Sequence, residues 1–177
     1  DVVWDNYRPG VMERLGIDYD TLKNINPKII CCSITGYGPS GPYRDYPSYD
    51  IIAQGLSGIM SVNGEPDGPP LKTGIPLADL AAGMFAALGV ATALVSRERT
   101  GKGQKINISL MDSCVSLLAY QMSYYFCGGD VPSRLGSGHL SVVPWGCYET
   151  MKGYITLGIC WPRIARTLGV DWMIDDP

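Results

Sequence analysis

The sequence is short of the residues that most metal sites and serine hydrolases need. Histidine occurs once in 177 residues, at His139, so the chain has no pair of histidines for a zinc site. The six cysteines have no CxxC spacing, and no GxSxG motif places a serine nucleophile on a strand-to-helix turn. We therefore expect no metal site and no Ser-His-Asp chemistry.

The chain also lacks an excess of charge of either sign. Fourteen Lys and Arg residues against 17 Asp and Glu residues give a net charge of −3, which excludes the broad positive field that binds nucleic acid or anionic membrane surfaces. Most cysteines lie in apolar runs, as is typical of reduced intracellular thiols. No secretory signal is visible. We expect a cytoplasmic protein, or a mitochondrial or peroxisomal one in a eukaryote, with any targeting segment outside this sequence.

Hydrophobic patterning predicts strands and helices that alternate along the first part of the chain. A β-like run at residues 2–4 precedes two short helices, and Asp18 is the predicted N-cap of the second helix, residues 19–26. The apolar, β-branched run 28–35 predicts a buried strand. Strand, two helices and strand in this order indicate a parallel α/β sheet.

The rest of the chain continues this pattern around one long apolar helix. We expect helices at residues 49–60, 78–97 and 111–126, a strand at 105–110, two short strands between 142 and 159, and a helix followed by a turn after 163. Small residues of the long helix recur at steps of three and four and form a smooth face that can lie close to another backbone: Ala82, Ala86, Gly89 and Ala93. Because Asp79 stands near its start, the stretch 77–95 is expected to be a buried helix and not a membrane span.

Two glycine-rich segments resemble phosphate-binding loops but lack the context that those loops need. Residues 36–41 match GxGxxG after a strand, yet Pro39 and Pro42 break the helix that a dinucleotide site requires. Residues 101–103 lack the GxxxxGK[ST] frame and precede a strand, so we expect a hairpin-like turn there.

Asp79 differs from the other acidic residues in its position at the start of the most apolar helix. The helix N-terminus favours the ionised carboxylate, while the apolar neighbours Leu77, Leu80 and Met84 remove its water. A desolvated, ionised carboxylate is a competent nucleophile. The alternative is that Asp79 only caps the helix, and the residues alone leave both possibilities open.

Six blocks in order resemble the family III CoA-transferases. They are DNYRPGVMERLG (5–16), NPKIICCSITGYGPSGP (26–42), YDIIAQGLSG (49–58), ADLAAGMFAALG (78–89), RTGKGQKINISLMD (99–112) and GHLSVVPWGCYET (138–150). The resemblance implies part of that α/β fold, with a parallel, Rossmann-like sheet, in an incomplete chain that forms an interlaced homodimer. It implies that residues 1–110 belong to the large CoA-binding domain, 111–140 form a helix and linker, and 141–177 begin a smaller domain.

The same resemblance implies exchange of coenzyme A between an acyl-CoA thioester and a free carboxylate or dicarboxylate. The residue that matches the family nucleophile is Asp79, which would form an aspartyl anhydride and then aspartyl-CoA. Coenzyme A and acyl-CoA are substrates, no permanently bound cofactor or metal is implied, and neither nucleic acid nor a membrane is an expected partner. The residues that match CoA-contacting positions are Asn6, Tyr7, Arg14, Tyr37 and Met111.

Three alternatives stay open. The family also contains α-methylacyl-CoA racemases, but Tyr49 precedes Asp50 where racemases carry histidine, and tyrosine with a pKa of about 10 is a poor base at neutral pH. Segment 138–145 is similar to transferases that handle dicarboxylates, including those that use succinyl-CoA, while formate-oxalate transfer also remains possible. The third is a CoA-binding member without catalytic activity. The oxyanion donors and the role of His139 are not assigned.

Overall fold

The computed structural model describes residues 1–158 and 161–174, and three of the predicted apolar runs form one parallel sheet in it. The strands are β1 (Val2–Asp5), β2 (Ile30–Thr35) and β3 (Lys105–Ser109), in the order β1-β2-β3. Val2 is paired with Ile30, and Cys31 with Lys105. The central strand β2 begins with buried residues, as a strand between two layers must. The predicted parallel α/β sheet is confirmed.

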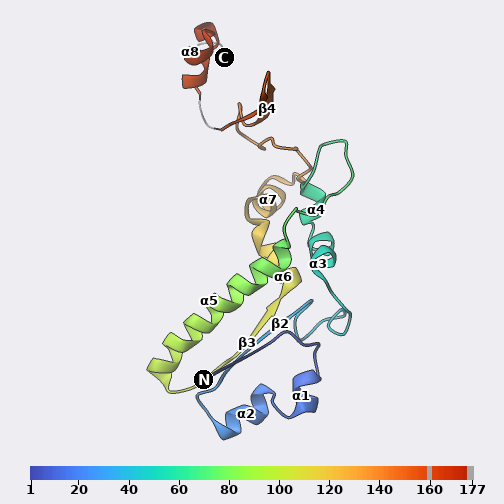
Figure 1. The fold of residues 1–177 in the computed structure, drawn as a ribbon, viewed down its shortest axis with the longest axis vertical. Coiled ribbons are helices and arrows are strands. Elements are labelled where there is room, and N and C mark those ends of the chain that lie inside the picture. Colours follow the sequence, from blue (N-terminus) through green and yellow to red (C-terminus); the bar gives the residue numbers. More distant parts are fainter. Residues whose placement is uncertain (159–160, 175–177) are drawn as a thin grey trace. The chain divides into compact units, whose positions relative to one another are not determined.

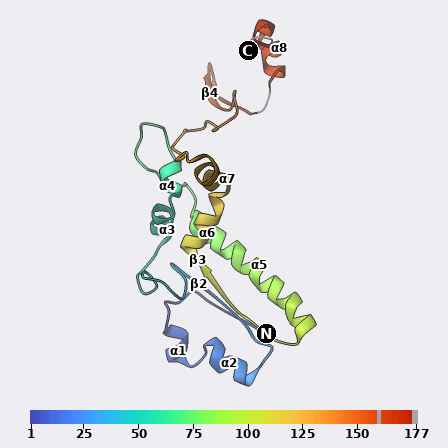
Figure 2. The same ribbon diagram turned by 180° about the vertical axis from the view of Figure 1, so that it is seen from behind.

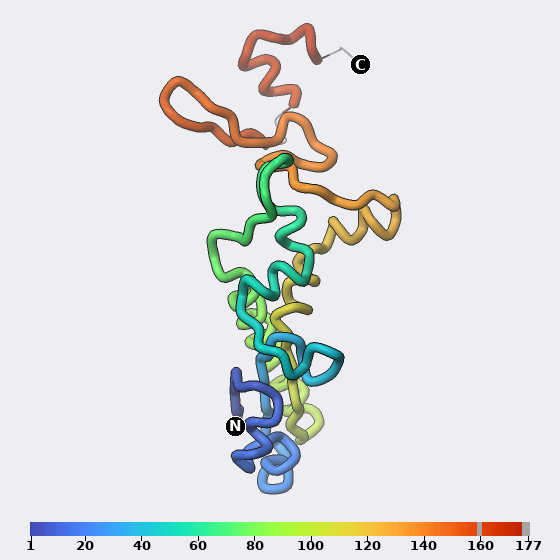
Figure 3. Tube along the Cα trace, turned by 90° about the vertical axis from the view of Figure 1, so that its right-hand side faces the viewer, coloured from blue at the N-terminus to red at the C-terminus, as the bar shows by residue number. Residues whose placement is uncertain are grey.

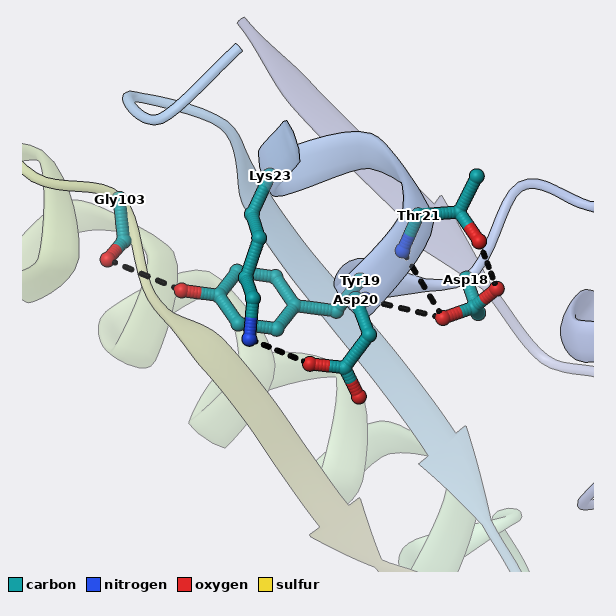
Figure 4. Close-up of polar contacts among 6 residues, drawn as sticks. All are labelled: Asp18, Tyr19, Asp20, Thr21, Lys23 and Gly103. Carbon is teal, nitrogen blue, oxygen red and sulfur yellow. Dashed lines mark hydrogen bonds and ion pairs between the residues drawn. The ribbon is translucent and has the colours of Figure 1, made fainter. Parts of the chain in front are cut away.

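Two short helices join β1 to β2, and their start is fixed by a local polar cap. They are α1 (Val11–Leu15) and α2 (Tyr19–Ile25). Asp18 caps α2 as predicted, because its carboxylate accepts hydrogen bonds from the backbone N–H groups of Asp20 and Thr21 at 2.9 and 3.2 Å (Figure 4). The Thr21 hydroxyl also donates to this carboxylate and is the largest cause of the lowered pKa of Asp18. One turn further on, Lys23 pairs with Asp20.

Helix α5 (Leu77–Thr100) connects β2 to β3 and packs on the sheet through alanine side chains. All five of its buried residues are alanines: Ala78, Ala81, Ala82, Ala86 and Ala93. Figure 1 and Figure 2 show α5 on one side of the strands and α1 and α2 on the other. Small side chains allow this close approach of helix and sheet, so the predicted smooth face is confirmed.

The opposite face of α5 is apolar and exposed. Leu80, Met84, Leu88 and Val95 are each about half exposed or more. The prediction of a buried helix is therefore correct for the alanine face only. By length and composition α5 also meets the criteria for a helix that crosses a membrane, with 28% of its apolar window buried.

The turn from α5 to β3 is a close contact between backbones. The Gly103 N–H donates to the Pro27 carbonyl at 2.8 Å. The Tyr19 hydroxyl donates to the Gly103 carbonyl at 3.3 Å, as Figure 4 shows. A Cβ atom on Gly103 would lie 1.7 Å from the carbonyl oxygen of Ile29. The expected hairpin-like turn is wrong, because this segment leads from a helix into a strand that runs parallel to its neighbour.

Two of the predicted helices are divided in the structure. The helix expected at 49–60 consists of α3 (Asp50–Leu56) and α4 (Ile59–Val62), which are separated at Gly58, where a positive φ of 90° ends the helical path. The helix expected at 111–126 consists of α6 (Leu110–Leu117), α7 (Ala119–Ser123) and the π-helix η1 (Tyr124–Gly128). The break after α6 falls at Leu118, whose ψ of 21° leaves the helical range.

The chain divides into two units, and the parallel sheet lies in the first. That unit comprises Asp1–Ser61 and Leu71–Pro132, while the second comprises Val62–Pro70 and Ser133–Pro177. In the second unit the two short strands predicted between 142 and 159 are β4 (Gly146–Thr150) and β5 (Gly153–Leu157), which form an antiparallel pair, visible as the orange hairpin in Figure 3. Helix α8 (Arg163–Leu168) and the 3-10 helix η2 (Asp171–Met173) follow.

The cysteines of the described residues are free thiols. Cys31, Cys32 and Cys114 are buried, and Cys127 and Cys147 are exposed. Cys160 lies outside the described residues. Desolvation raises the pKa of each of the three buried thiols, so these remain protonated and unreactive at neutral pH.

We predict that Gly103→Ala destabilises the protein, because the added methyl group would collide with the Ile29 carbonyl. Overpacking of this kind costs about 1 to 3 kcal/mol, measured as the change in free energy of unfolding in urea. The matched control is Gly83→Ala in α5, where a Cβ has no neighbour within 4 Å and the helix gains about 0.5 to 1 kcal/mol. Equal effects at the two positions would contradict the steric argument.

Candidate active site

A cavity of about 340 Å³ lies where the three parallel strands end. Asn6 and Tyr7 follow β1, Thr35 ends β2 and Gly36 follows it, and Leu110 follows β3. All five residues line this cavity. The carboxyl ends of parallel strands meet at one edge of a sheet, which is where α/β proteins bind their ligands. The topology therefore makes this edge the candidate active site.

The rest of the cavity wall comes from the loop after β2 and from the starts of two helices. The loop contributes Arg44, Ser48 and Tyr49, α3 contributes Asp50, and α5 contributes Asp79. Helix α5 runs back along the sheet between two parallel strands, so its first turn reaches the same edge as the strand ends. This is why a residue 44 positions after the end of β2 shares a cavity with it.

Asp79 is the third residue of α5, and its side chain is exposed to this cavity. Across residues 1–158 and 161–174, no hydrogen bond or ion pair engages its carboxylate. Desolvation raises the pKa of Asp79, and the negative charge of Asp50 raises it further. The carboxylate is therefore more basic than that of an ordinary aspartate.

Asp50, and not Asp79, caps the start of α5. The N-cap position is Pro76, which makes no side-chain hydrogen bond to the helix. Instead the Oδ1 atom of Asp50 accepts a hydrogen bond from the Ala78 N–H at 2.8 Å. The alternative in which Asp79 only caps its helix does not match this arrangement, and its carboxylate is left available for chemistry.

The five predicted CoA-contacting residues lie in different places around the site. Asn6 and Tyr7 line the cavity with Asp79, and the Asn6 amide donates to the Ile34 carbonyl at 2.8 Å. The other three do not line it. Arg14 is exposed on α1, the Tyr37 ring packs on Tyr43 with centroids 5.6 Å apart, and the Met111 N–H donates to the Gly36 carbonyl at 3.1 Å.

Sequence reasoning did not find two polar residues of this region. Arg44 lines the cavity from a loop that has no regular pattern, so no sequence signal marked it. Gln54 is completely buried on α3, and a signal for it existed: a glutamine four residues after Asp50 on one helix face can hydrogen-bond to that aspartate.

His139 lies in the second unit, where it contacts two residues that are close to it in the sequence. Its Nδ1 atom accepts a hydrogen bond from the Ser141 N–H at 3.1 Å, and its ring packs on Trp145 with centroids 5.1 Å apart. In the part of the chain that the structure describes, His, Cys, Asp and Glu form no group of three that could hold a metal ion.

Comparison with known families assigns this chain to one class of protein. Residues 1–177 match the family described as CoA-transferase family III. The chain belongs to CoA-transferase family III, in agreement with the resemblance of its six sequence blocks.

Named relatives and a solved structure agree with this assignment. The succinate–glutarate CoA-transferase of Agrobacterium fabrum is 39% identical over 99% of this chain and 45% of its own length. The acetyl-CoA:oxalate CoA-transferase of Acetobacter aceti is 43% identical over 84% of this chain and 39% of its own length. The crystal structure of a CAIB/BAIF family protein from Brucella suis matches with a TM-score of 0.87 and 37% identity, over 99% of this chain and 48% of that one. The chain thus spans less than half the length of each of these proteins.

The raised pKa of Asp79 predicts a stability difference that depends on pH. Between the unfolded and the folded pKa the folded protein binds more protons, so its stability falls as the pH rises and stays reduced above the folded pKa. We expect Asp79→Asn, which carries no charge, to raise the melting temperature at neutral pH. The difference from wild type should shrink as the pH is lowered toward 3.8, the usual value for aspartate.

The control for this experiment is Asp130→Asn, an exposed carboxylate that does not line the cavity. It should leave the melting temperature close to that of wild type throughout. An Asp79→Asn protein that melts at or below the wild-type temperature at neutral pH would contradict the desolvation argument.

Proposed function

We propose that the protein transfers coenzyme A between an acyl-CoA thioester and a free carboxylate, with Asp79 as the covalent nucleophile. The observation that carries the proposal is a carboxylate of raised pKa, engaged by no hydrogen bond among the described residues, in a cavity at the carboxyl ends of the sheet. Membership of CoA-transferase family III supports the same reaction.

The reaction proceeds by four acyl transfers. A carboxylate oxygen of Asp79 attacks the thioester carbonyl, and the C–S bond breaks to give a mixed anhydride and the CoA thiolate. The thiolate then attacks the aspartyl carbonyl, which releases the donor carboxylate and leaves aspartyl-CoA. The acceptor carboxylate then attacks aspartyl-CoA, which releases the CoA thiolate and forms a second anhydride. In the last step the thiolate attacks the acceptor acyl group of this anhydride, which gives the product acyl-CoA and frees the Asp79 carboxylate.

The raised pKa of Asp79 and the overall energetics both suit this series of steps. Because its pKa is raised, the ionised carboxylate is more basic and is a better nucleophile than an ordinary aspartate. One thioester is exchanged for another, so the overall reaction is close to isoenergetic. Each attack forms an oxyanion that hydrogen-bond donors must stabilise.

Coenzyme A is proposed to enter over the end of β1. Asn6 and Tyr7 line the cavity there, and an aromatic ring can pack against the adenine or the pantetheine arm. Arg14 is proposed to pair with a phosphate group. Tyr37 and Met111 remain proposed contacts outside the cavity.

The acceptor is proposed to be a dicarboxylate. Arg8 and Arg44 line the same cavity as Asp79, and a guanidinium binds a carboxylate through paired hydrogen bonds. One carboxylate of the acceptor would react while one of these arginines holds the other. The names of the Agrobacterium and Acetobacter relatives refer to succinate, glutarate and oxalate, all of which are dicarboxylates.

An interlaced homodimer is proposed for the whole protein. The exposed apolar face of α5, which includes Met84 and Leu88, supports it because apolar patches of this kind are usually covered in an assembly. The mass of the full-length protein in solution tests whether it forms this dimer.

We predict that an acyl-CoA donor modifies Asp79. The full-length protein is incubated with succinyl-CoA, and hydroxylamine or borohydride then converts an activated carboxylate into a hydroxamate or an alcohol. Peptide mass mapping should find the change on Asp79. The Asp50 carboxylate in the same digest is the internal control and should stay unmodified, since it is occupied as a helix cap.

Two results would contradict covalent catalysis by Asp79. One is a label on a different carboxylate. The other is full transferase activity in Asp79→Ala, because removal of a nucleophile lowers kcat by several orders of magnitude.

For substrate selection, we predict that Arg44→Gln raises the KM for succinate and glutarate about tenfold to a hundredfold, the value of one charge-assisted hydrogen bond. The KM for acetate, which has no second carboxylate, should change little. The matched control is Arg99→Gln at the far end of α5, about 30 Å from Asp79 at 1.5 Å per residue. Equal losses for acetate and succinate would contradict recognition of the second carboxylate.

A further inference from the structure

Gln54 of α3 is a completely buried amide whose polar atoms both have partners. Its Nε2 group donates to the Oδ2 atom of Asp50 at 2.6 Å. Its Oε1 atom accepts from the N–H and the hydroxyl of Thr73, at 2.9 and 3.2 Å. Donors on one side and a carboxylate on the other allow only one orientation of the amide.

Asp50 connects Gln54 to the start of α5. While Oδ2 accepts from Gln54, Oδ1 accepts from the Ala78 N–H at 2.8 Å. Ala78 is the residue directly before Asp79. A continuous chain of hydrogen bonds therefore runs from Thr73 through Gln54 and Asp50 to the first turn of α5.

We propose that Gln54 is a positioning residue for Asp79: it holds Asp50 on the Ala78 N–H and so fixes the helix turn from which the nucleophile projects. The inference rests on the proposed function. It goes beyond that function because Gln54 does not line the cavity and acts through Asp50.

The arrangement has two consequences at the nucleophile. The first is geometric, because the Asp79 carboxylate has no hydrogen bond of its own among the described residues and its position depends on the backbone that carries it. A misplacement of 1 Å costs about a hundredfold in rate. The second is electrostatic, because the amide keeps the charge of Asp50 beside Asp79, the neighbour whose charge also raises the pKa of Asp79.

Other charged and titratable groups surround Asp50 and Asp79. Arg8, Arg44 and Tyr49 line the same cavity as the two carboxylates, and desolvation and the charges of both carboxylates raise the pKa of Cys114 of α6. These groups are common to wild type and variants. We therefore compare each variant with wild type at the same pH.

The test uses Gln54→Glu and Gln54→Met, two side chains of similar length. A protonated glutamate can donate its O–H to Asp50 and accept from Thr73, as glutamine does, whereas an ionised glutamate has no donor and places a second negative charge beside Asp50. Methionine fills the volume but makes neither hydrogen bond.

With succinyl-CoA as donor and glutarate as acceptor, we expect kcat of Gln54→Glu to be about tenfold to a hundredfold below wild type at pH of about 8. The ratio to wild type should recover as the pH is lowered to about 5.5, where a buried glutamate beside a carboxylate is protonated. Gln54→Met should lose as much at high pH and show no recovery. The control Gln104→Glu, exposed beyond the far end of α5, should keep a constant ratio.

A second readout does not depend on catalysis. Hydrogen exchange of the Ala78 amide should become about tenfold or more faster in Gln54→Met, and in Gln54→Glu only at the higher pH. If wild type transfers CoA from no donor, the proposed function fails while amide exchange still decides the role of Gln54. If Gln54→Met does not fold, the pH dependence of Gln54→Glu decides it.

Two results would overturn the inference. One is wild-type kcat in Gln54→Met, which would mean that Gln54 only fills space. The other is a Gln54→Glu to wild-type ratio that does not change with pH, together with unchanged exchange at Ala78.

Discussion

The contact on which the site depends is that between the alanine face of α5 and the parallel sheet. Five buried alanines bring the helix close to β2 and β3, and the crossover brings its first turn to the edge where the strands end. A larger side chain at Ala82 or Ala86 would push the helix away from the sheet. The position of Asp79 in the cavity is thus decided by side chains that have no chemistry of their own.

The polar part of the site is built from a second set of contacts that extend over longer stretches of sequence. Asp50 caps a helix that begins 27 residues later, and Gln54 bonds to Thr73, 19 positions further on. Such contacts connect α3 to the start of α5 across a segment that contains only the short helix α4. If the buried amide of Gln54 lost its hydrogen bonds, it would destabilise the fold more than an apolar residue would. The connection is therefore specific as well as stabilising.

Local features of the fold were predictable from sequence, and distant ones were not. The cap at Asp18, the strand in residues 28–35 and the small-residue face of α5 all depend on neighbours within one turn or one strand, and each was found where predicted. The break at Leu118 has no glycine or proline to mark it. The catalytic candidate Asp79 was identified from its place on a helix. That Asp50 lies beside it and caps the same helix could be seen only in the folded chain, since capping from another helix leaves no pattern in the sequence.

Part of the cavity wall comes from helices and strand ends, and part comes from one loop. This division affects how the site can change in evolution. The proposed nucleophile Asp79 and the residues that support it belong to helices, whereas Arg44, Ser48 and Tyr49 belong to one irregular loop between β2 and α3. Substitutions and changes of length are tolerated in loops far better than in packed elements. If the proposed function holds, evolution can therefore alter which acid is accepted by changing this single loop, while the helix that carries Asp79 is retained.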